Sequence, residues 1–515
     1  MADVRDRRNA LLKACLFATG CAGIVAEFVL STLASYLLGN TTLQWTLVMS
    51  LMLFSMGLGS RLSLHIRDRL LDRFIAVEFT LSALCASCAA AAYFGTALAG
   101  QAGAIIYLYA TGIGLLIGLE IPLVARMNEA YEALRTNVAS VMEKDYYGAL
   151  VGGLLFAFFA LPKLGLTYTP IALGVVNFVV ASVLLWQYRD LLHRRRRLTA
   201  AFWTTAAGLV ALVALIRPIV LFGEQSRYRD RVVYEDQTRF QRIVITEWKG
   251  YHWLFLDSKV QFSTYDEERY HEPLVHPALR LAASRGRVLV LGGGDGLAAR
   301  EVLKHDDVTS VTLVDLDPAI TELAKTHPAL RVANAGALAD QRVEVVNADA
   351  GRYLEEAEGL YDVIVIDLPD PRGPNLARLY SKEFYLSCRR HLARYGTLVT
   401  QSTSPLHARS AFLCIDRTLR SAGFSTMPYH NAIPTMGDWG FILAMKADVI
   451  SSEVLRKRAE GLDFSGIETR FLDRDAMAGM LHFWKGMFDS AETISVSTEL
   501  EPTVDRYYRE AEWGW

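Results

Sequence analysis

Two patterns of apolar and polar positions divide this chain near residue 222. Before that point, long apolar runs alternate with short polar loops, and most runs approach the about 20 residues that a helix needs to cross a bilayer. Each run predicts a membrane span, with the first an anchor rather than a cleaved signal peptide because its apolar run is long and further runs follow it. The seven runs lie at residues 11–38, 43–62, 74–98, 102–124, 147–161, 168–186 and 201–222.

The second half has shorter apolar runs with a different period. RIVITEW and YHWLFLD are β-rich runs joined by Lys249 and Gly250, which predicts a hairpin. From residue 288 onward, strand-like and helical stretches alternate, which predicts a mainly parallel sheet with right-handed crossovers. We therefore expect a transmembrane helical domain at 1–222, a small β-rich subdomain and cleft segment at 223–275, and an α/β Rossmann-like domain of the methyltransferase type at 276–515.

Composition and charge narrow the class of protein. The chain is 52% hydrophobic, too apolar for an ordinary soluble protein of 515 residues, and this supports a multi-pass location in the cell membrane. A formal charge of −2 gives no reason to expect a nucleic-acid partner. The six cysteines lie mostly in apolar runs without paired spacing, so we expect free thiols, including Cys85 and Cys88 of the single CxxC.

Basic residues gather in alternate loops of the membrane half. They are Arg5, Arg7, Arg8 and Lys13 before the first run, then Arg61, Arg67, Arg69 and Arg73, then Arg126, Arg135 and Lys144, then Arg189 and 194–197. Such loops face the cytoplasm, and seven spans would then place the second half outside. The alternative is that the short run at 147–161 is re-entrant, which would leave the second half cytoplasmic. Both arrangements stay open at this point.

Three carboxylates and a set of glycines lie within the apolar runs. Glu27, Glu78 and Glu120 are costly there if ionised, so each could line a cation path or be held in the helical bundle for structural reasons. The glycines predict close packing between helices; they are Gly57, Gly59, Gly112, Gly114, Gly118, Gly148, Gly152 and Gly153.

A glycine turn follows the strand-like run at 287–291. Its residues 292–296, GGGDG, allow the backbone to turn sharply and to approach a ligand closely. Asp295 within the turn would repel a pyrophosphate and favours a ligand with hydroxyls or positive charge. About 20 residues on, Asp315 ends the next strand, where an acid binds ribose hydroxyls in nucleoside-binding sheets. The pair predicts a nucleoside-type ligand.

Further acids stand at the ends of later strands. Asp349 and Asp367 follow the third and fourth runs of the sheet, and ligands of open α/β sheets bind at those carboxyl ends. Asp367 and Asp370 flank a turn stiffened by Pro369 and Pro371, which suits a cationic ligand.

Over most of residues 230–445, the sequence resembles the spermidine synthase family, the polyamine aminopropyltransferases, and specifically its integral-membrane branch. The motifs LGGGDG, LVDLDP, NADAGRYL, IDLPDPRGP, LYSKEFY and LVTQ stand in the family's order, and YHEPLVH resembles its YHExxxH segment. The resemblance implies transfer of an aminopropyl group from decarboxylated S-adenosylmethionine to putrescine or a related amine, giving spermidine and methylthioadenosine. The resemblance implies that the protein uses no metal and no cofactor besides that co-substrate. The expected partners of the protein are these small molecules and the lipid bilayer, and the protein could also form a homo-oligomer.

The same resemblance implies roles for individual residues. Asp367 would be the general base. The nucleoside side of the site would comprise Gln241, Asp315, Asp349, Ala350 and Pro374. The polyamine side would comprise His271, Asp295 and Asp370, with Gln261 and Tyr270 lining the cleft.

Two departures from the family pattern affect the expected substrates. Met436 in IPTMGDWGF replaces an aromatic residue of the acceptor loop, which leaves the amine acceptor open, and Asp315 replaces the more usual glutamate. A methyltransferase is an alternative, although its donor carries a carboxylate that Asp295 would repel. A membrane polyamine transporter or sensor, with a binding domain that does not turn over, is the other.

Overall fold

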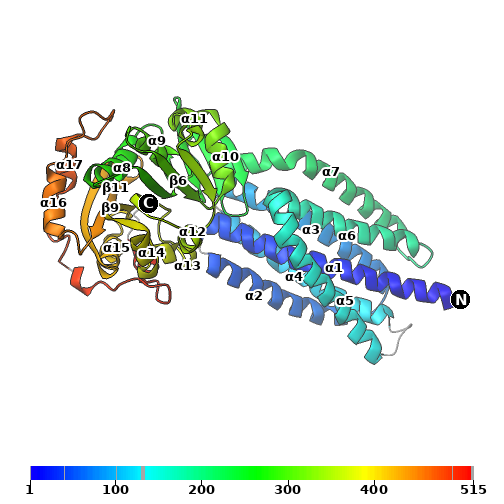
Figure 1. Ribbon diagram of the computed structural model, residues 1–515. Coiled ribbons are helices and arrows are strands. Elements are labelled where there is room, and N and C mark those ends of the chain that lie inside the picture. Colours follow the sequence, from blue (N-terminus) through cyan, green and yellow to red (C-terminus); the bar gives the residue numbers. More distant parts are fainter. Residues whose placement is uncertain (1, 40, 100, 129–133, 490, 512–515) are drawn as a thin grey trace. The chain divides into compact units, whose positions relative to one another are not determined.

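The computed structural model describes residues 2–39, 41–99, 101–128, 134–489 and 491–511 (Figure 1). The chain divides into two compact units, Met1–Gln241 and Arg242–Trp515, and each is described by itself. The side chains of Arg5, Arg7, Arg8 and Arg135 lie outside the described ones, so the loop-charge pattern at those positions rests on sequence alone.

The first unit is a bundle of long helices, in agreement with the predicted apolar runs. They are α1 (Ala2–Leu38), α2 (Thr41–Leu62), α3 (Leu70–Ala99), α4 (Ala102–Asn128), α5 (Leu134–Leu155), a π-helical segment (Phe156–Leu164), α6 (Gly165–Gln187) and α7 (Arg195–Gln225). Six segments of the described chain are long and apolar enough to cross a membrane, by length and composition. The number is six rather than seven because the fifth, Val138–Gln187, contains two of the predicted spans; its backbone breaks at Gly165, where φ is 62°.

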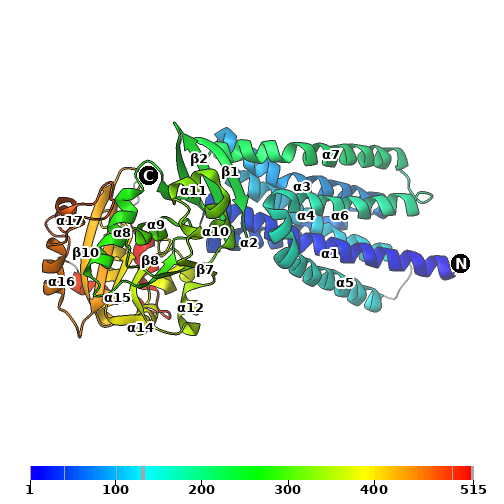
Figure 2. The same cartoon turned by 45° about the horizontal axis from the view of Figure 1, so that its top comes forward.

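Successive helices of the bundle run in opposite directions. Helix α1 is parallel to α5, because Phe17 faces Gly148 and, further along both helices, Cys21 faces Gly152. Helix α2 is parallel to α4 for the same reason, since Met52 faces Gly114 and Met56 faces Gly118. Helix α3 is parallel to α7, through Phe79 with Phe202 and Tyr93 with Gly223. In Figures 1 and 2, the start of α1 and the end of α7 accordingly lie at opposite ends of the bundle.

Glycines and buried carboxylates both lie inside this bundle. A Cβ atom added at Gly118 or Gly148 would meet a backbone carbonyl of the facing helix, which confirms the predicted close packing at these positions. The prediction is wrong for Gly57, because nothing lies within 4 Å of an added Cβ atom there. Glu27, Glu78 and Glu120 are all buried. Both carboxylate oxygens of Glu78 are without a hydrogen-bond partner in the described part of the chain. All six cysteines are free thiols, as expected.

A short strand, β1 (Arg231–Gln237), follows the bundle within the first unit. The second unit begins with β2 (Arg242–Trp248), β3 (Tyr251–Leu256) and β4 (Lys259–Ser263), which pair in antiparallel order. The turn between β2 and β3 has positive φ at Lys249 (53°) and Gly250 (82°), as a two-residue hairpin turn requires. The predicted hairpin is therefore confirmed.

The core of the second unit is a seven-stranded sheet in the order β10-β11-β9-β8-β5-β6-β7. Its strands are β5 (Arg287–Gly292), β6 (Ser310–Asp315), β7 (Val343–Asn347), β8 (Tyr361–Asp367), β9 (Leu392–Gln401), β10 (Phe424–Ile433) and β11 (Gly437–Lys446). Strands β5 to β9 are parallel, and β10 and β11 form an antiparallel edge. This confirms the predicted Rossmann-like fold.

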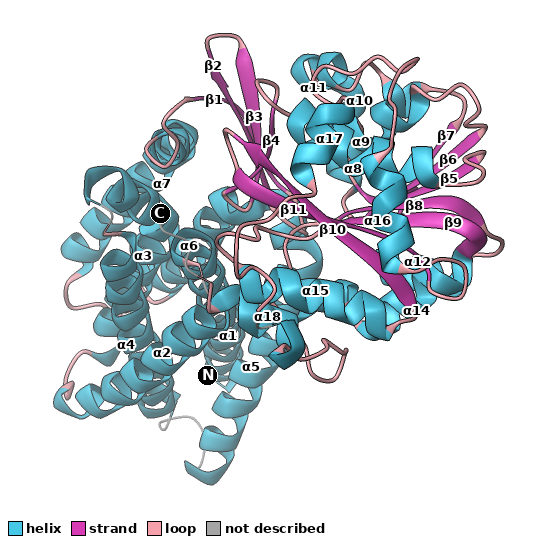
Figure 3. Cartoon of the chain, turned by 90° about the vertical axis from the view of Figure 1, so that its left-hand side faces the viewer, coloured by secondary structure: helices cyan, strands magenta, loops and turns pink. Residues whose placement is uncertain are grey.

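Helices cover both faces of this sheet, as Figure 3 shows. Val288 and Val290 of β5 pack on the face of α8 (Glu268–Leu281), α9 (Leu297–Leu303), α16 (Ser452–Glu460) and α17 (Arg474–Met480). Leu289 and Leu291 pack on the face of α12 (Ala350–Glu356), α14 (Lys382–His391), α15 (Arg409–Ser421) and α18 (Thr503–Arg509). The chain proceeds from β5 outward to β7 and then returns to β8 on the other side of β5. The switch point between β5 and β8 is where such folds bind ligands.

Candidate functional site

The glycine turn and Asp367 meet at this switch point. Gly292 ends β5 and pairs with Asp367, which ends β8. Gly292 and Gly293 have φ values of 84° and 65°, in the left-handed region that favours glycine. A Cβ atom on Gly293 would lie 3.1 Å from Oδ2 of Asp367, and one on Gly294 would lie 2.6 Å from the carboxylate of Asp315. The turn therefore brings bare backbone between two strand-end acids.

Asp315 is held by backbone amides at the end of β6. Its Oδ2 accepts a hydrogen bond from the Gly294 amide (3.0 Å), and its Oδ1 accepts one from the Asp317 amide (2.9 Å). Burial raises the pKa of Asp315 to about 6, although both amides favour the carboxylate. The position is the one that the sequence predicted for an acid that binds ribose hydroxyls.

Asp367 accepts a hydrogen bond at Oδ1 from the hydroxyl of Tyr270 (2.7 Å). Burial raises the pKa of Asp367, while the neighbouring His271 and the Tyr270 hydroxyl act in the opposite direction. Asp367 is half-buried, and the surrounding protein displaces much of the water around its carboxylate. The result is a stronger base than an exposed aspartate.

His271 is part of a buried chain of charged residues, of which the sequence analysis identified His271 but not Glu267. Its Nδ1 lies 3.1 Å from Oε2 of Glu267, and Glu267 accepts hydrogen bonds from Arg300 at 2.7 and 2.9 Å. Burial lowers the pKa of His271, but Glu267 outweighs this and raises it to about 9. His271 is therefore an imidazolium at neutral pH and balances the acids Asp295 and Asp367. Glu267 stands one turn before His271 in DEERYHE, and that i, i+4 spacing is the signal that could have identified it.

Two more acids complete the cleft. Asp295 accepts a hydrogen bond from the Leu297 amide (2.8 Å), and burial raises its pKa to about 6. Asp370 lies in the turn after β8, and burial raises its pKa to about 6 as well. Its Oδ2 accepts a hydrogen bond from the hydroxyl of Tyr508 (2.9 Å), whereas its Oδ1 has no hydrogen-bond partner in the described part of the chain. The side chains of Tyr508, Gln401 and Thr403 and the charge of Lys259 on β4 lie close enough to Asp370 to act against this rise in its pKa.

Two side chains donate hydrogen bonds to the backbone of the turn from Leu368 to Asp370. The Gln401 side chain, at the end of β9, donates to the carbonyl of Leu368 (2.6 Å). The Tyr380 hydroxyl donates to the carbonyls of Leu368 (3.2 Å) and Pro369 (3.0 Å). Both residues belong to motifs singled out in the sequence, LVTQ and LYSKEFY, but their bracing function follows only from the structure.

The remaining predicted residues are less closely tied to the cleft. Asp349 caps α12 by accepting from the Arg352 amide (3.0 Å) and pairs with Arg378. Although burial acts against it, Arg378 and the amide lower the pKa of Asp349. Ala350 is buried at the start of α12, and Pro374 is exposed at the start of α13 (Pro374–Ala377). Their expected nucleoside contacts stay predictions.

Gln261 and Gln241 also stay predictions. Gln261 on β4 donates to the Lys259 carbonyl of its own strand (3.3 Å). Gln241 is the last residue of the first unit, where its amide and carbonyl bond to Thr238. No contact of either side chain with the four acids follows from these bonds.

Met436 occupies the turn between β10 and β11, half-buried against the core. Its neighbour Thr435 is tied to the cleft segment, because Asp266 accepts hydrogen bonds from the Thr435 amide and hydroxyl, both at 2.8 Å. The acceptor loop named in the sequence is therefore anchored next to the start of α8, which carries Tyr270 and His271.

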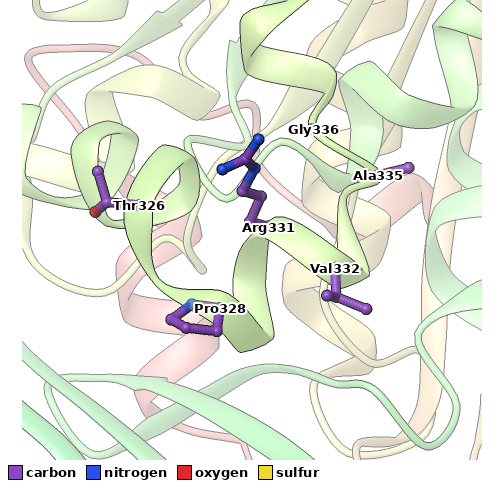
Figure 4. Close-up of a pocket in the computed structure, with 6 residues that line it drawn as sticks. All are labelled: Thr326, Pro328, Arg331, Val332, Ala335 and Gly336. Atoms are coloured by element: carbon purple, nitrogen blue, oxygen red, sulfur yellow. The ribbon is translucent and has the colours of Figure 1, made fainter.

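Figure 4 shows a separate pocket at α10 (Pro318–Thr326) and α11 (Pro328–Ala333). It is lined by Thr326, Pro328, Arg331, Val332, Ala335 and Gly336. None of these six residues belongs to the group of acids, and the chemistry described above lies at the β5–β8 switch point instead.

Comparison with known proteins gives consistent results. Residues 267–454 match the family model described as the spermine/spermidine synthase domain. Polyamine aminopropyltransferase 2 of Ralstonia nicotianae is 40% identical over 487 residues, 93% of this chain and 94% of that protein. Polyamine aminopropyltransferase 2 of Aquifex aeolicus is 38% identical over 508 residues, 97% of this chain and 98% of that protein. A spermidine synthase solved with the transition-state analogue AdoDATO covers 51% of this chain and 89% of its own at 27% identity, with a TM-score of 0.45.

Proposed function

The chain belongs to the polyamine aminopropyltransferase family, and from this premise we propose that it transfers the aminopropyl group of decarboxylated S-adenosylmethionine to putrescine, with Asp367 as general base. The observation that carries the proposal is the Asp367 carboxylate, oriented by Tyr270 at 2.7 Å and set against the bare backbone of Gly293. The products are spermidine and methylthioadenosine.

The reaction needs a base more than an acid. An amine of putrescine is an ammonium at neutral pH and gives one proton to Asp367. Its freed lone pair then attacks the aminopropyl carbon bonded to the sulfonium sulfur, a C–N bond forms, and the C–S bond breaks with its electron pair going to sulfur. The leaving group is a neutral thioether and needs no proton, so one well-placed carboxylate suffices.

The charges of the cleft support this pair of substrates. Decarboxylated S-adenosylmethionine and putrescine are both cationic, and four acids gather near the switch point, Asp295, Asp315, Asp367 and Asp370, with His271 beside Asp295 and Asp367 and Lys259 beside Asp370. The donor of a methyltransferase carries an additional carboxylate, which this group of acids would repel. We assign the ribose hydroxyls to Asp315, the tail of the donor to Asp295, and the distal ammonium of the acceptor to Asp370.

The first unit is proposed to anchor the enzyme in a lipid bilayer by seven crossings. The alternating directions of α1 to α7 support seven, since α5 and its π-helical extension continue in one direction until the break at Gly165. Helices α2, α4 and α6 end where α1 begins, and the basic residues Arg67, Arg126 and 194–197 lie at or just after those three helix ends. With those loops in the cytoplasm, the catalytic unit follows on the outer face.

The test is Asp367→Asn in the full-length protein in detergent, with methylthioadenosine and spermidine followed by mass spectrometry. Removing a general base is expected to lower kcat about a hundredfold or more. The matched control is Asp362→Asn, the same change on the same strand but facing Arg287 and Ser284. Product formation by Asp367→Asn at a rate close to wild type would exclude Asp367 as the base.

A further inference from the structure

The C-terminal segment, which shows no recognisable chemistry in the sequence, reaches the cleft. We propose that helix α18 determines the acceptor specificity of the enzyme, with Tyr508 as the positioning residue that aims Asp370 at the distal ammonium of the diamine. This inference rests on the proposed function and names a residue of that same site. The contacts of Tyr508 and Asp505, three residues apart on one face of α18, carry it.

Tyr508 holds one oxygen of Asp370 and leaves the other free. Its hydroxyl donates to Oδ2 over 2.9 Å, and its ring is 7% exposed and packed in the core under the sheet. Oδ1 of Asp370 has no hydrogen-bond partner among the described residues although it is buried. A buried carboxylate oxygen without a donor is costly, and an ammonium group would supply that donor.

Asp505 fixes the backbone of the same turn. Its Oδ1 accepts a hydrogen bond from the Gly373 amide (2.8 Å), and its Oδ2 accepts one from Arg509 (2.6 Å). Asp505 is buried, and Gly373 has a φ of 82°, so the turn depends on this one conformation. Asp505 and Tyr508 together tie α18 to residues 370–373 at two points.

The segment is rigid enough to act as a template. The Lys382 amide donates to the Ser497 carbonyl (2.9 Å), and the Cys414 thiol donates to the Ser495 carbonyl (3.2 Å). Val504 is fully buried in the same core. Residues 494–509 are therefore packed against α14 and α15, and Tyr508 lies in the same core.

Acceptor selection follows from this arrangement. A diamine must present one nitrogen to Asp367 and the other to Oδ1 of Asp370, so the direction of that oxygen sets the preferred chain length. The aromatic residue that the family places in the acceptor loop is Met436 here, which has no hydroxyl. In this chain, α18 supplies a hydroxyl that donates to Asp370.

The experiment compares Tyr508→Phe with Tyr507→Phe in the full-length protein. Both changes remove one hydroxyl from α18, but that of Tyr507 accepts from the Ser495 amide (3.3 Å) and does not reach the cleft. For Tyr508→Phe, we expect the KM for putrescine to rise about tenfold, as for a lost hydrogen bond to a charged group, with the KM for the donor unchanged. The preference for putrescine over shorter and longer diamines should shrink, whereas Tyr507→Phe should match wild type.

The pH profile adds a readout that a structural role would not change. The Tyr508 bond lowers the pKa of Asp370, so its loss should raise that pKa and move the acid limb of kcat/KM for putrescine to higher pH. Unchanged acceptor KM and acid limb in Tyr508→Phe would overturn the inference, as would equal losses for donor and acceptor. If wild type releases no methylthioadenosine, the proposed function fails. The role of Tyr508 is then tested by measuring putrescine binding by calorimetry, and equal affinities of wild type and Tyr508→Phe would overturn the inference.

Discussion

The Tyr270 hydroxyl donates a 2.7 Å hydrogen bond to Oδ1 of Asp367, joining residues 97 positions apart in the chain. The ring of Tyr270 packs edge-on against Phe441 of β11, with centroids 5.4 Å apart. Helix α8 thereby delivers a fixed donor to the end of β8. This hydrogen bond restricts the rotation of the carboxylate.

Replacing Tyr270 by Phe tests this relationship. The hydrogen bond favours the charged form of Asp367, so its loss should raise the pKa of Asp367 further. Because the base must be ionised, the acid limb of the kcat profile should move to higher pH, and kcat at pH 7 should fall about tenfold. Tyr395→Phe, an exposed tyrosine at the start of β9, is the control. An unshifted limb would mean that Tyr270 does not tune the base.

The stability of the second unit should depend on pH through His271. The folded pKa of His271 is about 9, above its ordinary value of 6.5, so the charged histidine stabilises the fold fully below pH 6.5. That contribution is lost as the pH rises toward 9. His271→Gln should cost about 2 kcal/mol at pH 6 and flatten the dependence of the thermal midpoint between pH 6.5 and 9. His391→Gln, at the end of α14, should keep the wild-type slope; a wild-type slope in His271→Gln would contradict the assignment.

Gly294→Ala should weaken donor binding. The new Cβ would lie 2.6 Å from the Asp315 carboxylate and would push it away from the Gly294 amide. We expect the KM for decarboxylated S-adenosylmethionine to rise about tenfold, with the KM for putrescine nearly unchanged. Gly479→Ala on α17 is the matched control, since nothing lies within 4 Å of its added Cβ. A normal donor KM in Gly294→Ala would show that Asp315 does not bind the donor.

Reporter fusions test the seven crossings. A phosphatase that is active only outside the cytoplasm, fused after Trp515, should be active in intact cells. The same reporter fused after residue 190, between α6 and α7, should be inactive because an even number of helices precedes it. Activity at residue 190 and none after Trp515 would contradict seven crossings and restore the re-entrant alternative for 147–161, with the second half in the cytoplasm. Two fusions on the same side would rule out α7 as a crossing.

The local pattern of the sequence was enough to predict most of the fold. The apolar runs, the hairpin at Lys249 and Gly250, and the strands that end near Asp315 and Asp367 depend on neighbours within a few residues. The glycine turn and the acids after each strand could likewise be placed together, because parallel strands end at one edge of a sheet. The apolar runs of the first unit could likewise be counted from the sequence, because each depends on neighbouring residues, although two of them form one segment broken at Gly165.

The tertiary structure alone decided which atoms of these residues are available. Asp349 is engaged with Arg378, 29 residues away, and Glu267 is engaged with Arg300, 33 residues away. Tyr508 reaches Asp370 across 138 residues and leaves only one of its oxygens free. Such contacts depend on how α8, α9 and α18 pack on the sheet, and the pattern of apolar and polar residues does not predict this packing. The sequence by itself determined the elements and the edge at which the acids gather, and packing between distant segments decided their charge, orientation and partners.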